Sequence, residues 1–496
     1  MSEPSAINST AMAVFIFFFA LVTVLGFVAA RWKRGDLTQL HEWGLGGRQF
    51  GTLISWFLVG GDFYTAYTVI AVPALVYSVG AYGFFALPYT IIVYPFVFAV
   101  MPKLWEVCHR KNHITAADYV QGEFGGKWLP AAVALTGIIA TLPYIALQLV
   151  GMQVVIKSLG VTGELPLVVA FAILAVYTYS SGLRAPAMIA FVKDIMIYIV
   201  VIVAVSIIPS KLGGYASLFD AADKFFQTKG GTTGIILHPS QFMAYATLAL
   251  GSALAAFMYP HTMTAVLSSS SAKTVRKNAI ILPAYTLLLG LIAVLGYMAI
   301  AANVHVTSAS DVVPTLFLTL FPSWFVGFAA AAIAISALVP AAIMSIGAAN
   351  LFTRNLYKPL FAPNVTPEKE AKSAKLFSLV VKFGALLFII VLPTQYAIDL
   401  QLLGGVWILQ IFPAVVFSLY TRRLTTTGLF AGWIVGIVLG TGLAAVMGLK
   451  PVYTLHIGGG AYPTYIGLIA LAANIVVSFV VSALTQSQRV VARAAH

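Results

Sequence analysis

The sequence is dominated by apolar segments long enough to cross a lipid bilayer. About 13 such segments follow one another along the chain, each near the roughly 20 residues that a transmembrane helix requires. They lie near residues 10–30, 51–79, 82–102, 127–156, 163–180, 186–208, 238–259, 277–303, 324–352, 374–395, 397–420, 426–448 and 461–485. Because spanning helices satisfy their backbone groups internally, the segments predict an all-α polytopic membrane protein, with residues 1–496 forming one transmembrane domain.

The composition excludes soluble proteins. Hydrophobic residues make up 60% of the chain and charged residues only 9%, whereas soluble domains are about 25% charged. The net charge of +13 reflects the basic bias of cytoplasmic loops and does not indicate nucleic-acid binding. The single cysteine, Cys108, excludes a disulfide framework, an iron–sulfur cluster and a thiolate zinc site.

Basic residues predict the orientation of the chain. Arg31, Lys33 and Arg34 follow the first apolar segment, which therefore is not a cleaved signal peptide. They make the first loop cytoplasmic, so the N-terminus lies outside and an odd number of spans places the C-terminus in the cytoplasm. Most later basic residues fall in the predicted inner loops, and the outer loops hold only Lys157, Lys211, Lys224, Lys229 and Lys450.

Two of the predicted spans contain interruptions. The second holds Gly60-Gly61-Asp62 followed by Pro73, and the seventh holds Gly251-Ser252 followed by Met258-Tyr259-Pro260-His261. Interrupted spans five apart are typical of transporters built from inverted repeats, with the binding site near the middle of the membrane. Packing notches are the alternative explanation for the glycines. Asp62 favours the functional interpretation, because an acid inside a span is costly.

Several motifs occur in order along nearly the whole chain. They are Glu42-Trp43-Gly44-Leu45-Gly46-Gly47-Arg48, Thr115-Ala116-Ala117-Asp118-Tyr119 with Glu123-Phe124-Gly125, Pro260-His261, and Pro413, Arg422, Thr425, Gly428, Ala431-Gly432 and Gly436. Together they resemble the motifs of the sodium:solute symporter family. Glu123 and Ala265 stand where the family has arginines.

Three stretches look most like the bacterial monocarboxylate permeases of that family, which carry lactate and pyruvate. They are residues 60–65, 336–340 and 350–355. The resemblance implies a cation-coupled secondary transporter in the inner (plasma) membrane. It also implies the LeuT-type fold, with spans 2–6 (about 51–208) and 7–11 (about 238–420) as inverted repeats and peripheral spans at 10–30, 426–448 and 461–485.

The resemblance implies a position for the family's sodium site. Backbone carbonyls would come from Gly60, Phe63 and Ser336, but the two hydroxyl ligands of the family fall on Val339 and Pro340. Neither side chain has an oxygen. We therefore expect coupling to H⁺ and not to Na⁺ at this site.

Asp62 is the predicted proton-binding group. No lysine or arginine lies in its own span, and a low-dielectric environment favours the neutral form of a carboxyl group. A protonated carboxyl would not repel an arriving anion. Two alternatives remain: Asp62 binds sodium directly, or it caps the half-helix after the break.

Seven side chains are predicted to contact the substrate. They are Tyr64, Thr65, Tyr144, Gln148, Ser252, Trp407 and Gln410. Tyr144 and Gln148 are four apart in one span, and Trp407 and Gln410 are three apart in another, so each pair shares a helical face. The alternative for these pairs is a hydrogen bond between packed helices. No arginine lies inside a predicted span, so we expect backbone N–H groups at the breaks to bind the substrate carboxylate.

Four other polar residues are expected to be structural, and an inner gate is the alternative for Lys193 and Asp194. Adjacent helix residues do not face each other, so Lys193 and Asp194 should find separate partners or extend to the interface. Lys382 should likewise extend to the interface. His261 is predicted to be structural and near the inner side, with no second histidine or HExxH spacing that would indicate a metal site.

Other functional classes have little support in the sequence. No GxSxG, HExxH or P-loop pattern occurs, so we expect neither an enzyme nor a bound cofactor beyond the coupling cation. A channel would need a filter or charged rings, which one acid does not form. The main alternative is a Na⁺-coupled symporter of another small organic solute. The expected partners are a small monocarboxylate and membrane lipid.

Overall fold

The computed structural model describes residues 7–31, 35–391 and 394–494. Two residues of the predicted cytoplasmic cluster, Lys33 and Arg34, lie outside the described residues. So do residues 392 and 393, at the end of the predicted tenth span. The described part of the chain is mostly helical, and its only sheet is one two-stranded hairpin.

The helices follow one another with short connections. In the first half they are α1 (Ser9–Val28), α2 (Leu40–Leu45), α3 (Thr52–Phe63), α4 (Ala66–Val79), α5 (Ala86–Arg110), α6 (Ala116–Phe124), α7 (Trp128–Ser158), α8 (Leu165–Ser181), α9 (Arg184–Lys211) and α10 (Gly214–Lys229). In the second half they are α11 (Phe242–Ala256), α12 (Pro260–Leu267), α13 (Ala272–Ile281), α14 (Ala284–Ala301), α15 (Val312–Leu320), α16 (Ser323–Leu351), the π-helical turn η6 (Phe352–Tyr357), α17 (Lys358–Leu360), α18 (Pro367–Val391), α19 (Thr394–Ile408), α20 (Phe412–Val415), α21 (Thr426–Val446) and α22 (Ile466–Ala494).

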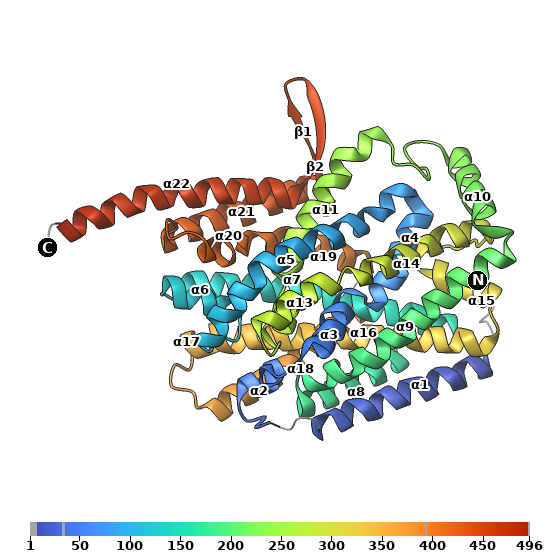
Figure 1. Cartoon of the computed structure of the whole chain (residues 1–496), viewed down its shortest axis with the longest axis horizontal. Helices are drawn as coiled ribbons and strands as arrows, with labels where there is room; N and C mark the ends of the chain where they lie inside the picture. The colour runs from blue at the N-terminus through green and yellow to red at the C-terminus, as the bar shows by residue number, and fades with distance from the viewer. Residues whose placement is uncertain (1–6, 32–34, 392–393, 495–496) are drawn as a thin grey trace.

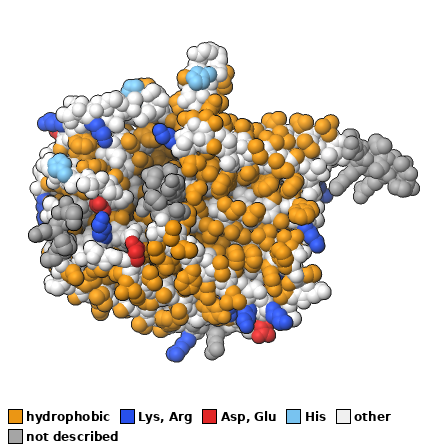
Figure 2. Space-filling view, turned by 180° about the vertical axis from the view of Figure 1, so that it is seen from behind, with side chains coloured by type: hydrophobic (Ala, Val, Ile, Leu, Met, Phe, Trp, Pro, Cys, Tyr) orange, Lys and Arg blue, Asp and Glu red, His pale blue; other side chains and the backbone are white. Residues whose placement is uncertain are grey.

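The chain is a multi-pass membrane protein. Among the described residues, 10 helices are long and apolar enough to span a membrane, and two bent helix pairs raise the number to 12. The span predicted at 163–180 corresponds to α8, which at 17 residues is shorter. Figure 2 shows hydrophobic side chains over most of one face, with few charged side chains, mostly toward its edges. A count of 13 spans stays a prediction.

Helix α16 forms the centre of the molecule. Its most apolar window is 100% buried, whereas that of α1 is 22% buried. Small residues let its neighbours come close. A Cβ atom on Gly347 would lie 2.9 Å from the Pro260 carbonyl, so this glycine allows the start of α12 to pack directly against α16.

The bend in the second span lies later than predicted, whereas the bend in the seventh span falls at the predicted residues Met258, Tyr259 and Pro260. Helix α3 continues through the Gly60-Gly61 pair and ends at Phe63, and the bend of 46° follows at Tyr64 and Thr65. Helix α11 likewise passes through the Gly251-Ser252 pair, and the 51° bend comes just before Pro260. A residue before proline avoids helical geometry, and proline itself fits the first helical position, so Pro260 sets where α12 begins.

The C-terminal part contains an element that the sequence pattern did not predict. The predicted span 461–485 begins instead with strand β2 (Gly460–Tyr465), which pairs antiparallel with β1 (Val452–Ile457). The helix of this span starts only at Ile466. The predicted start of the last span, at residue 461, is therefore wrong. Tyr462 and Tyr465 are apolar enough that the apolar segment of the sequence runs from the hairpin into α22.

Figure 1 shows how the ends of the helices are distributed along the longest axis. The start of α1, helix α10 and helix α15 lie toward the right of the view. Helices α6 and α17 and the end of α22 lie toward the left.

Candidate functional site

The two helix breaks meet in the interior. Asp62 lies in the last turn of α3, and His261 lies in the first turn of α12. Their side chains are buried, and Nε2 of His261 is 3.8 Å from Oδ2 of Asp62. The break regions, about 200 residues apart in the sequence, thus bring an acid and an imidazole together.

Aromatic residues surround the imidazole. The ring centroids of Tyr144 and Tyr259 lie 5.5 and 5.2 Å from that of His261, and the two tyrosine rings are 5.8 Å apart. One turn along α7, Nε2 of Gln148 donates to the backbone carbonyl of Tyr144 at 3.4 Å, on the shared face that the sequence predicts. We call these four residues, together with Asp62, the break cluster.

The break cluster contains an unusual number of unsatisfied polar atoms. Among the described residues, both carboxylate oxygens of Asp62, Nδ1 of His261, Oε1 of Gln148 and the hydroxyl of Tyr259 are buried without a hydrogen-bond partner. Buried polar atoms are nearly always paired, so each such group calls for an explanation. Several of them in one place fit a site for a polar ligand or a transferred proton.

The half-helices at the breaks begin differently. Thr65 caps α4, because its Oγ1 accepts the backbone N–H of Thr68 at 3.2 Å. The alternative that Asp62 provides this cap is therefore wrong. At α12 the N-cap residue, Tyr259, makes no side-chain capping bond. The uncapped N-terminus of α12, next to the break cluster, can attract an anion.

The carbonyls predicted to bind a cation already accept hydrogen bonds. The Gly60 carbonyl accepts the Tyr64 N–H at 2.9 Å, and the Phe63 carbonyl accepts Oγ1 of Thr68 at 2.9 Å. Both interactions lie within the chain at the first break. The two carbonyls are therefore not free ends of an open helix.

Lys193 donates hydrogen bonds to two other backbone carbonyls of the first break. Its Nζ donates to the carbonyls of Gly61 and Tyr64 at 2.9 Å each, and lies 2.6 Å from Oδ1 of Asp194. Both residues have partners on other helices, as the sequence predicts, but the two side chains also pair with each other, which was not expected. The flexible lysine stem lets Nζ reach back to the neighbouring carboxylate, and both side chains are buried instead of extending to the interface. Oδ2 of Asp194 accepts the Tyr285 hydroxyl at 2.6 Å.

The predicted sodium position on α16 offers little to a cation. Ser336, Val339 and Pro340 are buried inside this continuous helix. The Ser336 hydroxyl donates to the Ala332 carbonyl at 2.7 Å. Pro340 has no N–H for the Ser336 carbonyl, so this oxygen has no helical partner, but residues 339 and 340 add no side-chain oxygen.

Trp407 and Gln410 have their hydrogen-bond partners outside the break cluster. Nε1 of Trp407 donates to Oγ1 of Thr441 on α21 at 2.8 Å. Nδ2 of Asn474 on α22 donates to the backbone carbonyl and to Oε1 of Gln410 at 2.9 and 3.2 Å. Ser252 lies seven residues before Tyr259 on α11, partly exposed. Their roles in substrate binding stay predictions.

Lys382 does not extend to the interface as expected. Its side chain is fully buried, and its Nζ donates to Oγ of Ser378, one turn earlier on α18, at 2.6 Å.

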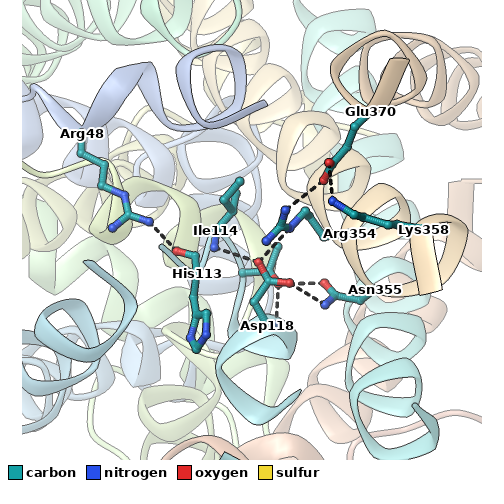
Figure 3. Close-up of polar contacts among 9 residues, drawn as sticks. Arg48, His113, Ile114, Asp118, Arg354, Asn355, Lys358 and Glu370 are labelled. Carbon is teal, nitrogen blue, oxygen red and sulfur yellow. Dashed lines mark hydrogen bonds and ion pairs between the residues drawn. The ribbon is translucent and has the colours of Figure 1, made fainter. Parts of the chain in front are cut away.

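A second polar cluster joins loops at the left end of the molecule (Figure 3). We call it the loop-end cluster; its members are Arg48, His113, Ile114, Thr115, Asp118, Arg354, Asn355, Lys358 and Glu370. Asp118 lies at its centre and accepts from the Ile114 N–H, from Nε of Arg354 and from Nδ2 of Asn355 at 2.9, 3.2 and 2.8 Å. The Thr115…Asp118 motif thus ties α6 to the end of the central helix.

Both helix breaks and the loop-end cluster lie in a region shared with a known protein family. The sequence model of the sodium:solute symporter family matches residues 43–436. The chain belongs to this family. It is a symporter-family transporter and not an enzyme, as the sequence predicts. The match covers both helix breaks and the loop-end cluster.

Several known proteins are similar in sequence or structure over almost the full length of the chain. A protein of Rhizobium johnstonii named monocarboxylate transport permease is 67% identical over 96% of this chain and 97% of its own length. The symporter YodF of Bacillus subtilis is 34% identical over 95% of this chain and 92% of its own. A solved structure of a Na⁺-coupled sialic acid symporter, bound to substrate and open outward, has a TM-score of 0.77 at 16% identity and covers 96% and 97% of the two chains. The fold is therefore that of a sodium symporter.

Proposed function

We propose that this protein is a proton-coupled symporter that takes up small monocarboxylates such as lactate or pyruvate. The observation that carries the proposal is the buried carboxyl of Asp62, which lies at the junction of two helix breaks without a hydrogen-bond donor among the described residues. A carboxyl group that binds and releases a proton during transport needs oxygens that are not already held by hydrogen-bond donors. The substrate class is supported by the 67% identical monocarboxylate permease.

In this proposal the substrate carboxylate binds at the start of α12. The first backbone N–H groups of that helix lack a side-chain cap, and His261 and Tyr144 lie beside them. Gln148 adds an unpaired acceptor, Oε1, which can accept a hydrogen bond from the hydroxyl of lactate. Protonation of Asp62 removes a negative charge 3.8 Å from His261 and so lowers the repulsion that an arriving anion meets.

We also propose that the protein lies in the inner membrane of a bacterial-type cell with its N-terminus outside and its C-terminus in the cytoplasm. The end of α22 and the basic residues of the loop-end cluster share one end of the long axis, and α1 begins toward the other (Figure 1). An excess of arginine and lysine is typical of cytoplasmic loops.

Counterflow in proteoliposomes tests the substrate class. Vesicles loaded with unlabelled lactate or pyruvate should take up the labelled acid, and neither proline nor sugars should replace them. If proline or a sugar supports counterflow and the acids do not, the substrate assignment is wrong.

A second candidate is a Na⁺-coupled symporter of another small solute. It is favoured by sodium/proline symporters of Staphylococcus aureus, 24% identical over 95% of this chain and 91% of their own. Uptake driven separately by a sodium gradient at fixed pH and by a proton gradient without sodium separates the two candidates.

Gln148 gives a test of the proposed binding site. Changing Gln148→Ala removes an amide from the break cluster, and losing one hydrogen bond of about 1–1.5 kcal/mol raises the KM of uptake about tenfold. Gln153→Ala is the matched control, because Gln153 lies on the same helix but donates to Glu164 at 2.9 Å. Equal KM values for the two variants would place the substrate elsewhere.

A further inference from the structure

We propose that the ammonium group of Lys193 is a built-in cation that fills the cation position of the first helix break and makes transport independent of sodium. The inference rests on the proposed function in one respect, that sodium does not drive uptake. It names Lys193 as the residue that determines this ion specificity.

The contacts of Lys193 match those of a bound cation. Its Nζ has three acceptors within 2.9 Å: the carbonyls of Gly61 and Tyr64, and Oδ1 of Asp194. An ammonium group has three N–H donors, so this set uses all of them. The side chain is fully buried, and no donor remains for a substrate carboxylate.

The acceptors exist because the helix is interrupted. The carbonyls of Gly61 and Tyr64 would pair with the N–H groups four residues later in an unbroken helix. Thr65 has left helical geometry, and the N–H of Thr68 donates to Oγ1 of Thr65 instead. In broken transporter helices, such unwound carbonyls are the groups that coordinate sodium.

The space for the ammonium depends on a glycine. A Cβ atom on Gly61 would lie 3.1 Å from Nζ of Lys193 and 3.3 Å from Oδ2 of Asp194. Any side chain at this position would crowd the ion pair. Gly61 therefore leaves room for Lys193, and helix α3 continues through it.

The surrounding charges also disfavour a second cation. Asp194 is neutralised by Lys193, and its other oxygen accepts the Tyr285 hydroxyl at 2.6 Å. A sodium ion beside Nζ would meet like charge at short range in a low-dielectric interior.

Removing the ammonium should open the position to a free ion. In Lys193→Ala the carbonyls of Gly61 and Tyr64 and the carboxylate of Asp194 lose their shared donor and are left as an oxygen-only set. Sodium can bind such a set, and a ligand that binds only the folded state raises its stability. We therefore expect a sodium response in the variant that the wild type lacks.

The test measures thermal unfolding of the purified full-length protein in lipid nanodiscs. Sodium chloride is compared with choline chloride at equal ionic strength, without substrate or gradients. The wild type should unfold at the same temperature in both salts, and Lys193→Ala should unfold at least about 3 °C higher in saturating sodium. Lys382→Ala is the matched control, because it removes another fully buried lysine, whose Nζ bonds only Ser378 among the described residues; it should show no sodium response.

Either of two results overturns the proposal. One is a higher unfolding temperature of the wild type in sodium chloride than in choline chloride. This result can be obtained even if the Lys193→Ala variant does not fold. The other is an equal response of the Lys193→Ala and Lys382→Ala variants. Because no substrate or proton gradient enters the experiment, its failure is distinct from failure of the proposed monocarboxylate transport.

Discussion

Changing Asp62→Asn should abolish concentrative uptake and spare exchange. Asparagine has nearly the size of the protonated acid and carries no titratable proton. Both oxygens of Asp62 lack a hydrogen-bond partner within the described chain, so the substitution breaks no hydrogen bond there. The carrier should still bind substrate and equilibrate it, but an imposed proton gradient should no longer raise the internal concentration above the external one.

Proteoliposomes allow both activities to be measured in one preparation. Uptake of labelled lactate under a proton gradient reports coupling, and counterflow at equal pH reports exchange. Asp220→Asn, at an exposed acid on α10, is the control and should retain both. Loss of exchange together with uptake would show that Asp62 is needed for binding or folding. Wild-type uptake that follows a sodium gradient and ignores a proton gradient would falsify the coupling proposal itself.

The sequence could predict the spans and the polar faces that depend on local spacing. Hydropathy located the long helices because a lipid-facing helix must be apolar over its full length. Tyr144 and Gln148 were found because residues four apart share a helical face. These inferences need no knowledge of how distant segments pack.

The contacts of the break cluster could not be read from local spacing. His261 lies 3.8 Å from Asp62 because the two breaks meet in three dimensions, a contact that spacing along the chain does not predict. A signal was present: Pro260-His261 follows one interruption, and Asp62 precedes the other. In a transporter with two interrupted spans, residues beside both breaks are candidates to meet.

The positions of the helix breaks show a second limit of prediction from the sequence. The glycines of Gly60-Gly61 and Gly251-Ser252 suggested interruptions, but helices α3 and α11 run through both positions. Glycine is tolerated within a helix when a neighbour needs the space, as Lys193 and Tyr285 do beside Gly61 and Gly60. Proline is the stronger signal, because Pro260 excludes helical geometry in the residue before it.

Changing Asp118→Ala should destabilise the folded protein strongly. The carboxylate of Asp118 accepts from Ile114, Arg354 and Asn355 at 2.8–3.2 Å, in a buried position that joins α6 to the turn after α16 (Figure 3). Breaking a buried ion pair from one side costs about 3–5 kcal/mol, because the partner is left uncompensated. Arg354 keeps its contact with Glu370 at 3.0 Å, so we expect the lower end of this range.

The temperature of unfolding in nanodiscs measures this effect, with transport at low temperature as a second reading. Asp118→Asn retains one acceptor oxygen and should fall between the wild type and the alanine variant. Asp220→Ala makes the same truncation at an exposed acid and should leave the unfolding temperature unchanged, since surface substitutions usually change stability by less than about 0.5 kcal/mol. If Asp118→Ala unfolds at the wild-type temperature, the loop-end cluster does not stabilise the fold. If it unfolds early but transports normally when folded, the cluster holds the loops together and takes no part in the transport cycle.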